Sequence, residues 1–225
     1  MRARALPSVT LAAALLAMIA SRSGVARAGE LSGSVNVVDS EGKSVSPAGA
    51  IVYVIGFSEE PPKTAATIEQ RNRQFVPELL PITVGQEISF PNRDALLHNV
   101  FSSSSVRPFD LGSYKQGESK KKSFPRAGAI DVYCNIHPEM AATILVLPNR
   151  RWARVDGAGR YRIDGLPKGK WTAFAYVRLA TKPVSAPIEI SDEAAATLDL
   201  TITRGAARPH VNKYGEAYRD PNKYR

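Results

Sequence analysis

The residues with the clearest chemical potential lie together in the stretch DVYCNIHPEM, residues 131–140. It contains Cys134, the only cysteine of the chain, followed at intervals of three residues by His137 and Met140. Taken singly, a cysteine or a methionine is usually a packing residue, and a lone histidine usually forms a hydrogen bond at the surface. Their regular spacing favours a shared metal site with soft ligands over three separate coincidences.

A second imidazole has to come from another part of the chain. His98, in NRDALLHNV, precedes Cys134 by 36 residues, whereas His210 belongs to the C-terminal tail. A thiolate, two imidazoles and a weak thioether suit copper that cycles between two oxidation states. Structural zinc usually takes several thiolates, haem attachment needs C-x-x-C-H, and a dinuclear copper centre would want a second cysteine. We therefore expect one mononuclear copper site formed by His98, Cys134, His137 and Met140.

The first residues are typical of an export signal. A basic start, MRARALP, precedes a thirteen-residue apolar run over residues 8–20 and the cleavage motif ARA at residues 26–28. The run is shorter than the roughly 20 residues that a membrane span needs, although retention as an uncleaved anchor is the alternative. We expect a periplasmic protein with no membrane span in its mature form. Cleavage removes four arginines, lowers the formal net charge from +9 to +5 and leaves Met140 as the only methionine.

Composition narrows the function classes. In an oxidising compartment a single cysteine has no partner within its chain, so Cys134 is buried and inert, paired between molecules, or bound to something. The sequence contains no paired carboxylates, nucleophile–base set or phosphate loop that would indicate hydrolysis. Its basic charge is too scattered to indicate nucleic-acid binding. The lysine run 120–122 indicates either docking to an acidic partner or protection of an exposed edge strand, and we favour the second.

Frequent Pro and Gly and short alternating apolar runs predict an all-β protein. Residues 31–56 fit two strands around the turn DSEGK, and residues 64–90 hold another strand pair. Ile130, Val132 and Cys134 lie on one face of the strand that leads into the candidate ligand loop.

At these residues the chain resembles the cupredoxins, the small blue-copper proteins, and within them the amicyanin and plastocyanin types. The likeness covers residues 64–148 and rests on NRDALLHNV and on FDLGSYKQGESKKKSFPRAGAIDVYCNIHPEM, with its short C-x-x-H-x-x-M spacing. It implies a Greek-key β-sandwich or barrel with a type 1 copper site. His98, Cys134 and His137 would then be the equatorial ligands, and Met140 the axial ligand.

The resemblance also implies roles for neighbouring residues. Asn99 matches the residue that ties the two ligand loops together and donates a backbone N–H to the thiolate. Tyr133 matches the position that offers a second electron route to the surface, while His137 is the ligand nearest solvent. Pro138 has no N–H and cannot bond to the thiolate, which influences the potential of the copper.

Residues 31–56 and 151–203 resemble a second family, the transthyretin-like module called the carboxypeptidase regulatory-like domain. GSVNVVDSEGKSVSPAGAIVYV is similar to its first hairpin and DGAGRYRIDGLPKGKWTAFAYV to its middle. This implies a small β-sandwich split in sequence around the copper domain; alternatively, residues 31–56 are extra strands of the cupredoxin barrel. The expected organisation is a signal peptide (1–28), first strands of the split sandwich (29–60), the copper domain (62–148), the rest of the sandwich (149–204) and a basic, tyrosine-rich tail (205–225).

A copper ion whose four positions are filled by protein suits outer-sphere electron transfer, so we expect an electron carrier rather than an enzyme. Leu96, Leu97, Ile136 and Pro138 would form an apolar edge beside His137 that permits brief docking. The expected partner is a periplasmic cytochrome or dehydrogenase. The alternative is a copper-binding accessory protein that stores, senses or delivers copper for a periplasmic oxidoreductase. The complete ligand set favours the carrier.

Overall fold

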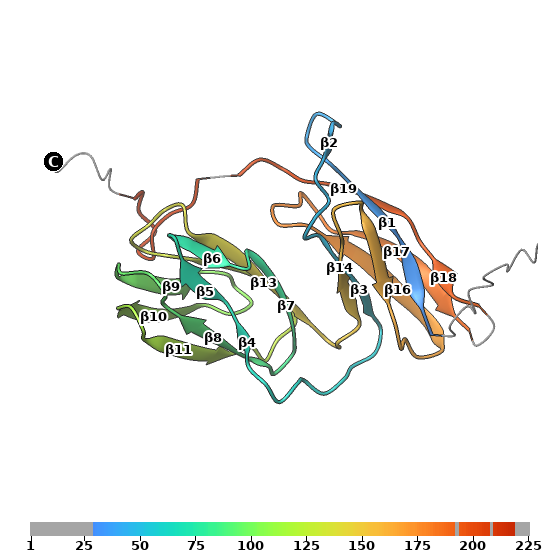
Figure 1. The fold of residues 1–225 in the computed structure, drawn as a ribbon, viewed down its shortest axis with the longest axis horizontal. Coiled ribbons are helices and arrows are strands. Elements are labelled where there is room, and N and C mark those ends of the chain that lie inside the picture. Colours follow the sequence, from blue (N-terminus) through green and yellow to red (C-terminus); the bar gives the residue numbers. More distant parts are fainter. Residues whose placement is uncertain (1–28, 192–193, 208, 219–225) are drawn as a thin grey trace, which may run out of the picture.

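The computed structural model describes residues 29–191, 194–207 and 209–218. In these residues all regular structure is β, and the strands form two sandwiches that pack side by side (Figure 1). The expected signal peptide and residues 219–225 of the tail lie outside the described residues. Within the described part, no helix combines the length and the hydrophobicity needed to cross a membrane.

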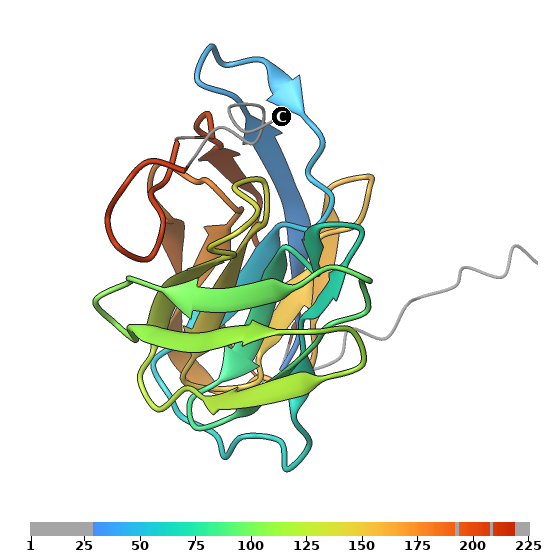
Figure 2. The same ribbon diagram turned by 90° about the vertical axis from the view of Figure 1, so that its left-hand side faces the viewer.

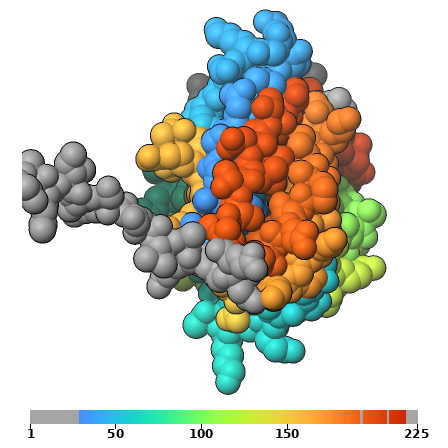
Figure 3. Space-filling view, turned by 90° about the vertical axis from the view of Figure 1, so that its right-hand side faces the viewer, coloured from blue at the N-terminus to red at the C-terminus, as the bar shows by residue number. Residues whose placement is uncertain are grey.

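The outer sandwich is built from two segments that are far apart in the sequence. Its strands are β1 (Leu31–Val38), β2 (Ser44–Val45), β3 (Ile51–Ile55), β14 (Trp152–Arg154), β15 (Arg160–Ile163), β16 (Gly169–Tyr176), β17 (Val184–Ile190), β18 (Ala196–Thr197) and β19 (Leu200–Thr203). β1 pairs with β15 and β19, and β3 pairs with β14 and β16. Figure 3 shows the blue N-terminal strand lying beside the orange and red C-terminal strands. The pairing follows the split arrangement rather than the alternative of extra barrel strands.

The inserted sandwich lies between β3 and β14 in the sequence. Its strands are β4 (Ala66–Thr67), β5 (Glu69–Arg71), β6 (Gln74–Val76), β7 (Leu79–Thr83), β8 (Glu87–Pro91), β9 (His98–Ser102), β10 (Phe109–Tyr114), β11 (Ser119–Ser123), β12 (Gly128–Tyr133) and β13 (Ala141–Leu147). One sheet has the order β10-β9-β12-β13-β7, and a second has the order β11-β8-β4 (Figure 2). β11 is an edge strand, which agrees with the edge-protection interpretation of the lysine run 120–122.

The two sandwiches share a third apolar core at their junction. Along β3, Val52 and Val54 point into the core of the outer sandwich, whereas Ile51 and Tyr53 face the inserted sandwich. β13 does the same from the other side, because Leu145 contributes to the junction while its neighbours belong to the inserted core. Strands buried on both faces are apolar at nearly every position, which explains the runs IVYVI and TILVL.

The region between residues 64 and 90 has more strands than the predicted pair. An additional hairpin, β5–β6, turns at Asn72 and Arg73, which both have left-handed backbone conformations (φ 54° and 56°). Two consecutive left-handed residues are the geometry of a type I′ hairpin turn. Arginine is uncommon in this conformation, so the residue types alone do not indicate the turn. This hairpin matters for the site, because the amides of its turn contact a residue of the first ligand loop.

Candidate metal centre

Two adjacent strands position the candidate ligands at one end of the inserted sandwich. His98 is the first residue of β9, and Cys134 directly follows β12. β9 and β12 are paired where Tyr133 lies opposite Phe101. As the sequence predicted, Ile130 and Val132 are buried in the same core as Cys134, so alternation along β12 directs the cysteine inward.

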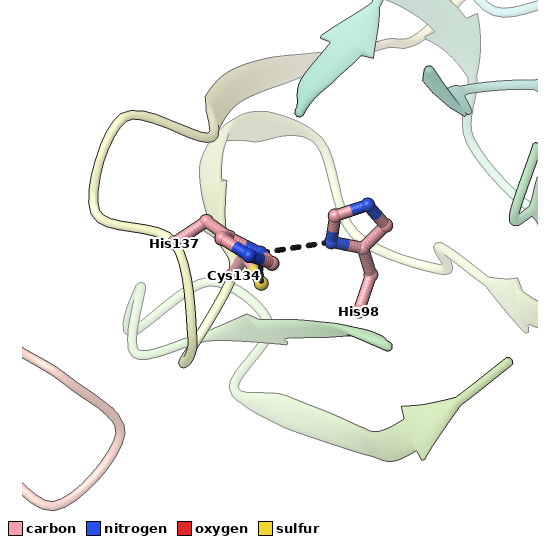
Figure 4. Close-up of side chains that lie close together, drawn as sticks. All are labelled: His98, Cys134 and His137. Atoms are coloured by element: carbon pink, nitrogen blue, oxygen red, sulfur yellow. Dashed lines mark hydrogen bonds between the residues drawn. The ribbon is translucent and has the colours of Figure 1, made fainter. Parts of the chain in front are cut away.

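Three of the four predicted ligands converge. The Nδ1 atoms of His98 and His137 lie 3.0 Å apart, and Cys134 Sγ lies 3.7 Å from Nδ1 of His137 (Figure 4). One donor atom from each residue lies within 4.8 Å of the others. His98 and Cys134 are fully buried, whereas His137 is partly exposed. Burial, followed by the neighbouring His98, lowers the pKa of His137, so its imidazole is neutral near pH 7 and has a lone pair to offer a metal.

The loop from Cys134 to Met140 is closed by its own backbone. The N–H of Cys134 donates to the carbonyl of Met140 (3.2 Å), and the N–H of Met140 donates to the carbonyl of His137 (3.0 Å). The N–H of Ile136 donates to Cys134 Sγ (3.4 Å), so the sulfur is fixed from within the loop. Met140 is fully buried in the same core as Cys134. The loop thus holds the backbone of Met140 against Cys134 and His137, with its side chain in the core that also contains Cys134.

The ring of His98 is oriented by a carboxylate that the sequence did not single out. Asp94 Oδ2 lies 2.7 Å from Nε2 of His98, which turns Nδ1 towards His137. Burial raises the pKa of Asp94, but hydrogen bonds from the amide of Arg73, from His98 and from the amide of Asn72 outweigh burial and keep this pKa below its ordinary value. The carboxylate is therefore ionised at neutral pH. A carboxylate on the far nitrogen of an imidazole is the usual way to fix the tautomer and orientation of a metal-binding histidine.

Asn99 joins the two ligand loops, which is the first of the roles that the resemblance implied for it. Its side-chain Oδ1 accepts a hydrogen bond from the backbone N–H of Asn135 (3.2 Å), the residue after Cys134. Its Nδ2 donates to Asp110 on β10 (2.7 Å). The second role, a bond from the backbone N–H of Asn99 to the thiolate, stays a prediction, since the amide that contacts Sγ here belongs to Ile136.

The two candidate ligand loops carry exposed apolar side chains. Leu96 is 47% exposed, Leu97 is 55% exposed and Ile136 is 44% exposed. The two leucines precede His98, and the isoleucine precedes His137, so all three belong to the ligand loops. Large apolar side chains exposed on adjoining loops are typical of a contact surface for another molecule.

The remaining two predicted residues differ in their surroundings. Pro138 is exposed and lies within the turn that the N–H of Met140 closes onto the carbonyl of His137. Tyr133 is half-buried between two rings, with centroids 5.9 Å from Phe101 and 4.1 Å from His210. His210 comes from the tail, for which the sequence pattern predicted no particular place. The ring of Tyr133 is therefore covered by another part of the same chain.

Similarity to known proteins is found among solved structures. No family model matches the chain, and no curated protein matches it. Among solved structures, a mutant of amicyanin in its Cu(I) form is 21% identical, covers 42% of this chain and 97% of its own, and has a TM-score of 0.35. The purple cupredoxin from Nitrosopumilus maritimus is 22% identical, covers 36% of this chain and 98% of its own, and has a TM-score of 0.34. The copper-containing nitrite reductase from Thermus scotoductus SA-01 is 24% identical, and the match covers 42% of this chain and 25% of the reductase, with a TM-score of 0.36.

The donor set is chemically suited to one metal ion. Metal–nitrogen bonds are about 2.0 Å long and metal–sulfur bonds about 2.3 Å, so a single ion can reach three donors that lie this close together. Two imidazoles and one thiolate match the preferences of copper, and the burial of two of them excludes most competing water. The residues present therefore fit the group that the sequence predicted.

Proposed function

We propose that this chain binds one copper ion at a mononuclear type 1 site and carries single electrons between redox partners. His98, Cys134 and His137 would be the equatorial ligands and Met140 the axial ligand. The observation that carries the proposal is the convergence of two imidazole nitrogens and one thiol sulfur within 4.8 Å at the closed end of a β-sandwich. Bound copper supplies the one-electron redox chemistry.

The protein's own contribution is to hold its ligands in place. Asp94 fixes the ring of His98, and Asn99 fixes the loop that carries Cys134. The amide of Ile136 donates to the sulfur of Cys134. Because these contacts are made by the folded loops themselves, the ligands need little rearrangement when the charge of the site changes. This preorganisation favours a carrier over an enzyme that must admit a substrate.

The exposed apolar side chains of the two ligand loops support a docking role. Leu96, Leu97 and Ile136 would offer a small surface that a partner can cover briefly and release quickly, as weak redox encounters require. We propose that the partner is a periplasmic cytochrome or dehydrogenase that docks transiently at this edge. The proposal includes export to the periplasm, for which the sequence of residues 1–28 is the support.

A copper-delivery or copper-sensing role is the competing proposal. A delivery protein has to release its metal, so its donors are expected at an exposed and incomplete site. Here His98 and Cys134 are completely buried, which supports the carrier.

The two proposals are separated by electrochemistry and by competition for Cu(I). For a carrier, the copper-loaded protein should cycle reversibly by one electron in voltammetry and retain Cu(I) against a chelator. The matched control is Tyr161→Phe, a change in the outer sandwich that leaves all four ligands intact. Rapid transfer of Cu(I) to the chelator, together with irreversible cycling, would favour delivery and contradict electron transport.

A further inference from the structure

The C-terminal segment returns from the outer sandwich to the candidate metal centre. After β19 the chain leaves the outer sandwich, and residues 209–218 lie against the ligand loops of the inserted sandwich; we call these residues the strap (Figures 1 and 2). The strap contains the third histidine and two tyrosines. The sequence shows no periodicity here and predicted only a basic tail. Its place beside the site is therefore new information.

A closed circuit of hydrogen bonds joins the strap to both ligand loops. Lys213 Nζ donates to one oxygen of Asp110 (2.7 Å), and Asn99 Nδ2 donates to the other (2.7 Å). Asn99 accepts from the N–H of Asn135 (3.2 Å), and Asn135 Oδ1 accepts from the N–H of Lys213 (2.9 Å). Asn99 directly follows His98, and Asn135 directly follows Cys134. The strap thus bonds directly to the residue after Cys134, and through Asp110 to the residue after His98.

Charge complementarity strengthens this circuit. Burial raises the pKa of Asp110, but hydrogen bonds from Lys213, Gly112 and Asn99 outweigh it and lower this pKa overall. The bond to Asp110 is in turn the main cause of the raised pKa of Lys213. Both groups are therefore charged at neutral pH. A partly exposed ion pair alone contributes little, but here the carboxylate also accepts from Asn99, so the pair sets the position of a ligand-loop residue.

Aromatic residues of the strap cover the other side of the cysteine. The hydroxyl of Tyr218 donates to the carbonyl of Cys134 (2.8 Å), and burial raises the pKa of this phenol, so the hydroxyl stays protonated. His210 stacks on Tyr133 with centroids 4.1 Å apart and an interplanar angle of 22°. Tyr218 meets His210 edge to face, at 5.2 Å and 77°. These rings form one continuous cover over the residue before the cysteine and over the backbone of the cysteine itself.

We propose that the strap is an integral part of the metal centre. It holds the two ligand loops in register from outside and closes the Tyr133 face, so that a redox partner reaches the site at the edge of His137. Only the statement about the partner rests on the proposed function, because the positioning of the loops is a property of the chain without metal. Lys213 and Tyr218 are the positioning residues.

Hydrogen exchange of the full-length, metal-free protein tests the positioning role. The variant combines Lys213→Ala with Tyr218→Phe, which removes the side-chain hydrogen bonds to Asp110 and to the carbonyl of Cys134, so amides in residues 134–140 should exchange at least about tenfold faster. Lys213→Arg, made alone, should exchange as slowly as the parent in residues 134–140, because a guanidinium can still donate to Asp110. Tyr161→Phe is the matched control, since it removes an equivalent bond, from the Tyr161 hydroxyl to the Leu198 carbonyl (2.7 Å), in the outer sandwich.

Two results would overturn the proposal. The first is that residues 134–140 exchange as slowly in the double variant as in the parent. The second is that Tyr161→Phe accelerates exchange in residues 134–140 as much as the double variant does, which would indicate general loosening. Adding Cu(II) then gives a second readout, and the double variant should show a shifted thiolate-to-copper absorption band. If the parent binds no copper, the proposed function fails, while the exchange data still decide whether the strap positions the loops.

Discussion

The outer and inserted sandwiches are constructed alike but bury different kinds of side chain. Each has an apolar core between two sheets, and the two share a junction core. Of the nine buried polar side chains among the described residues, seven lie between Gln70 and Thr143, within the inserted sandwich. The outer sandwich keeps its carboxylates mainly in exposed turns, where Asp39 and Asp156 accept backbone N–H groups.

This difference shows where the fold serves the site. A buried polar group costs stability unless it is hydrogen-bonded, and the buried groups of the inserted sandwich are used to shape its loops. Asn92 donates to the carbonyls of Leu96 and Tyr114 and so sets the path of the first ligand loop. Asn99 sets the second. The outer sandwich has no such cluster among its described residues and serves as the frame from which the strap returns.

The largest expected effect comes from cutting a core side chain in each sandwich. Ile144→Ala, in the inserted core, and Ile202→Ala, in the outer core, remove fully buried side chains and should each lower the free energy of unfolding by about 2–5 kcal/mol. Only Ile144→Ala should also weaken copper binding, because its cavity lies in the core that holds Cys134 and Met140. Chemical denaturation and metal titration of both variants check this.

An equal loss of copper affinity in Ile144→Ala and Ile202→Ala would contradict the contrast between the two sandwiches. It would mean that the site depends on overall stability and not on the inserted core. Ile144→Val, which removes one methyl group, should cost about 0.5–1.5 kcal/mol and leave copper affinity close to the parent's.

The next effect concerns the carboxylate behind His98. Asp94→Asn keeps the shape of the side chain but removes the charge that orients the imidazole, so we expect copper affinity to fall about 10–100-fold. The matched control is Asp156→Asn, a carboxylate that accepts backbone N–H groups in an exposed turn of the outer sandwich. Competitive metal titration should show no change for the control. An unchanged affinity in Asp94→Asn would contradict the orienting role.

The smallest expected effect is a pH dependence near the junction. Glu59 accepts bonds from the amide of Arg150 and the side chain of Arg151. Burial raises the pKa of Glu59, but these bonds and the two positive charges outweigh it and lower this pKa below its ordinary value of about 4.3. A depressed carboxyl pKa contributes stability above the unfolded-state value, and this is lost as the pH falls through the folded-state value.

Glu59→Gln should therefore be less stable than the parent at pH 7 by no more than about 1 kcal/mol, since the carboxylate is partly exposed. The difference should shrink as the pH falls below about 4. Urea denaturation at several pH values measures it. A difference that stays constant down to about pH 3 would show that the side chain acts through packing and not through its charge.

The sequence indicated the candidate ligands more readily than the residues that hold them in place. Cys134, His137 and Met140 lie in one short loop, so their spacing alone brings them together. His98 followed from the scarcity of histidine, and Asn99 from the resemblance. Asp94 was missed because its contact with the imidazole exists only after its loop has folded against the amides of Asn72 and Arg73.

The fold shows the same limit. Alternation predicted the all-β class and the main strands, because period-two patterns are local, whereas the split pairing followed from the second resemblance. The hairpin at residues 69–76 was missed, since its turn uses an arginine in a left-handed conformation. The strap was missed for a different reason. Its position depends on side-chain contacts with Asp110 and Asn135, and no periodicity records such contacts.

The central claim is that Cys134 and its neighbours bind copper through a thiolate, and stoichiometric titration with Cu(II) tests it most directly. We predict that the parent turns intensely blue, that the colour saturates at about one equivalent, and that Cys134→Ser stays colourless while remaining folded. Titration of Cys134→Ser to the same blue endpoint, or a parent that binds Cu(II) without the colour of a thiolate-to-copper transition, would contradict it.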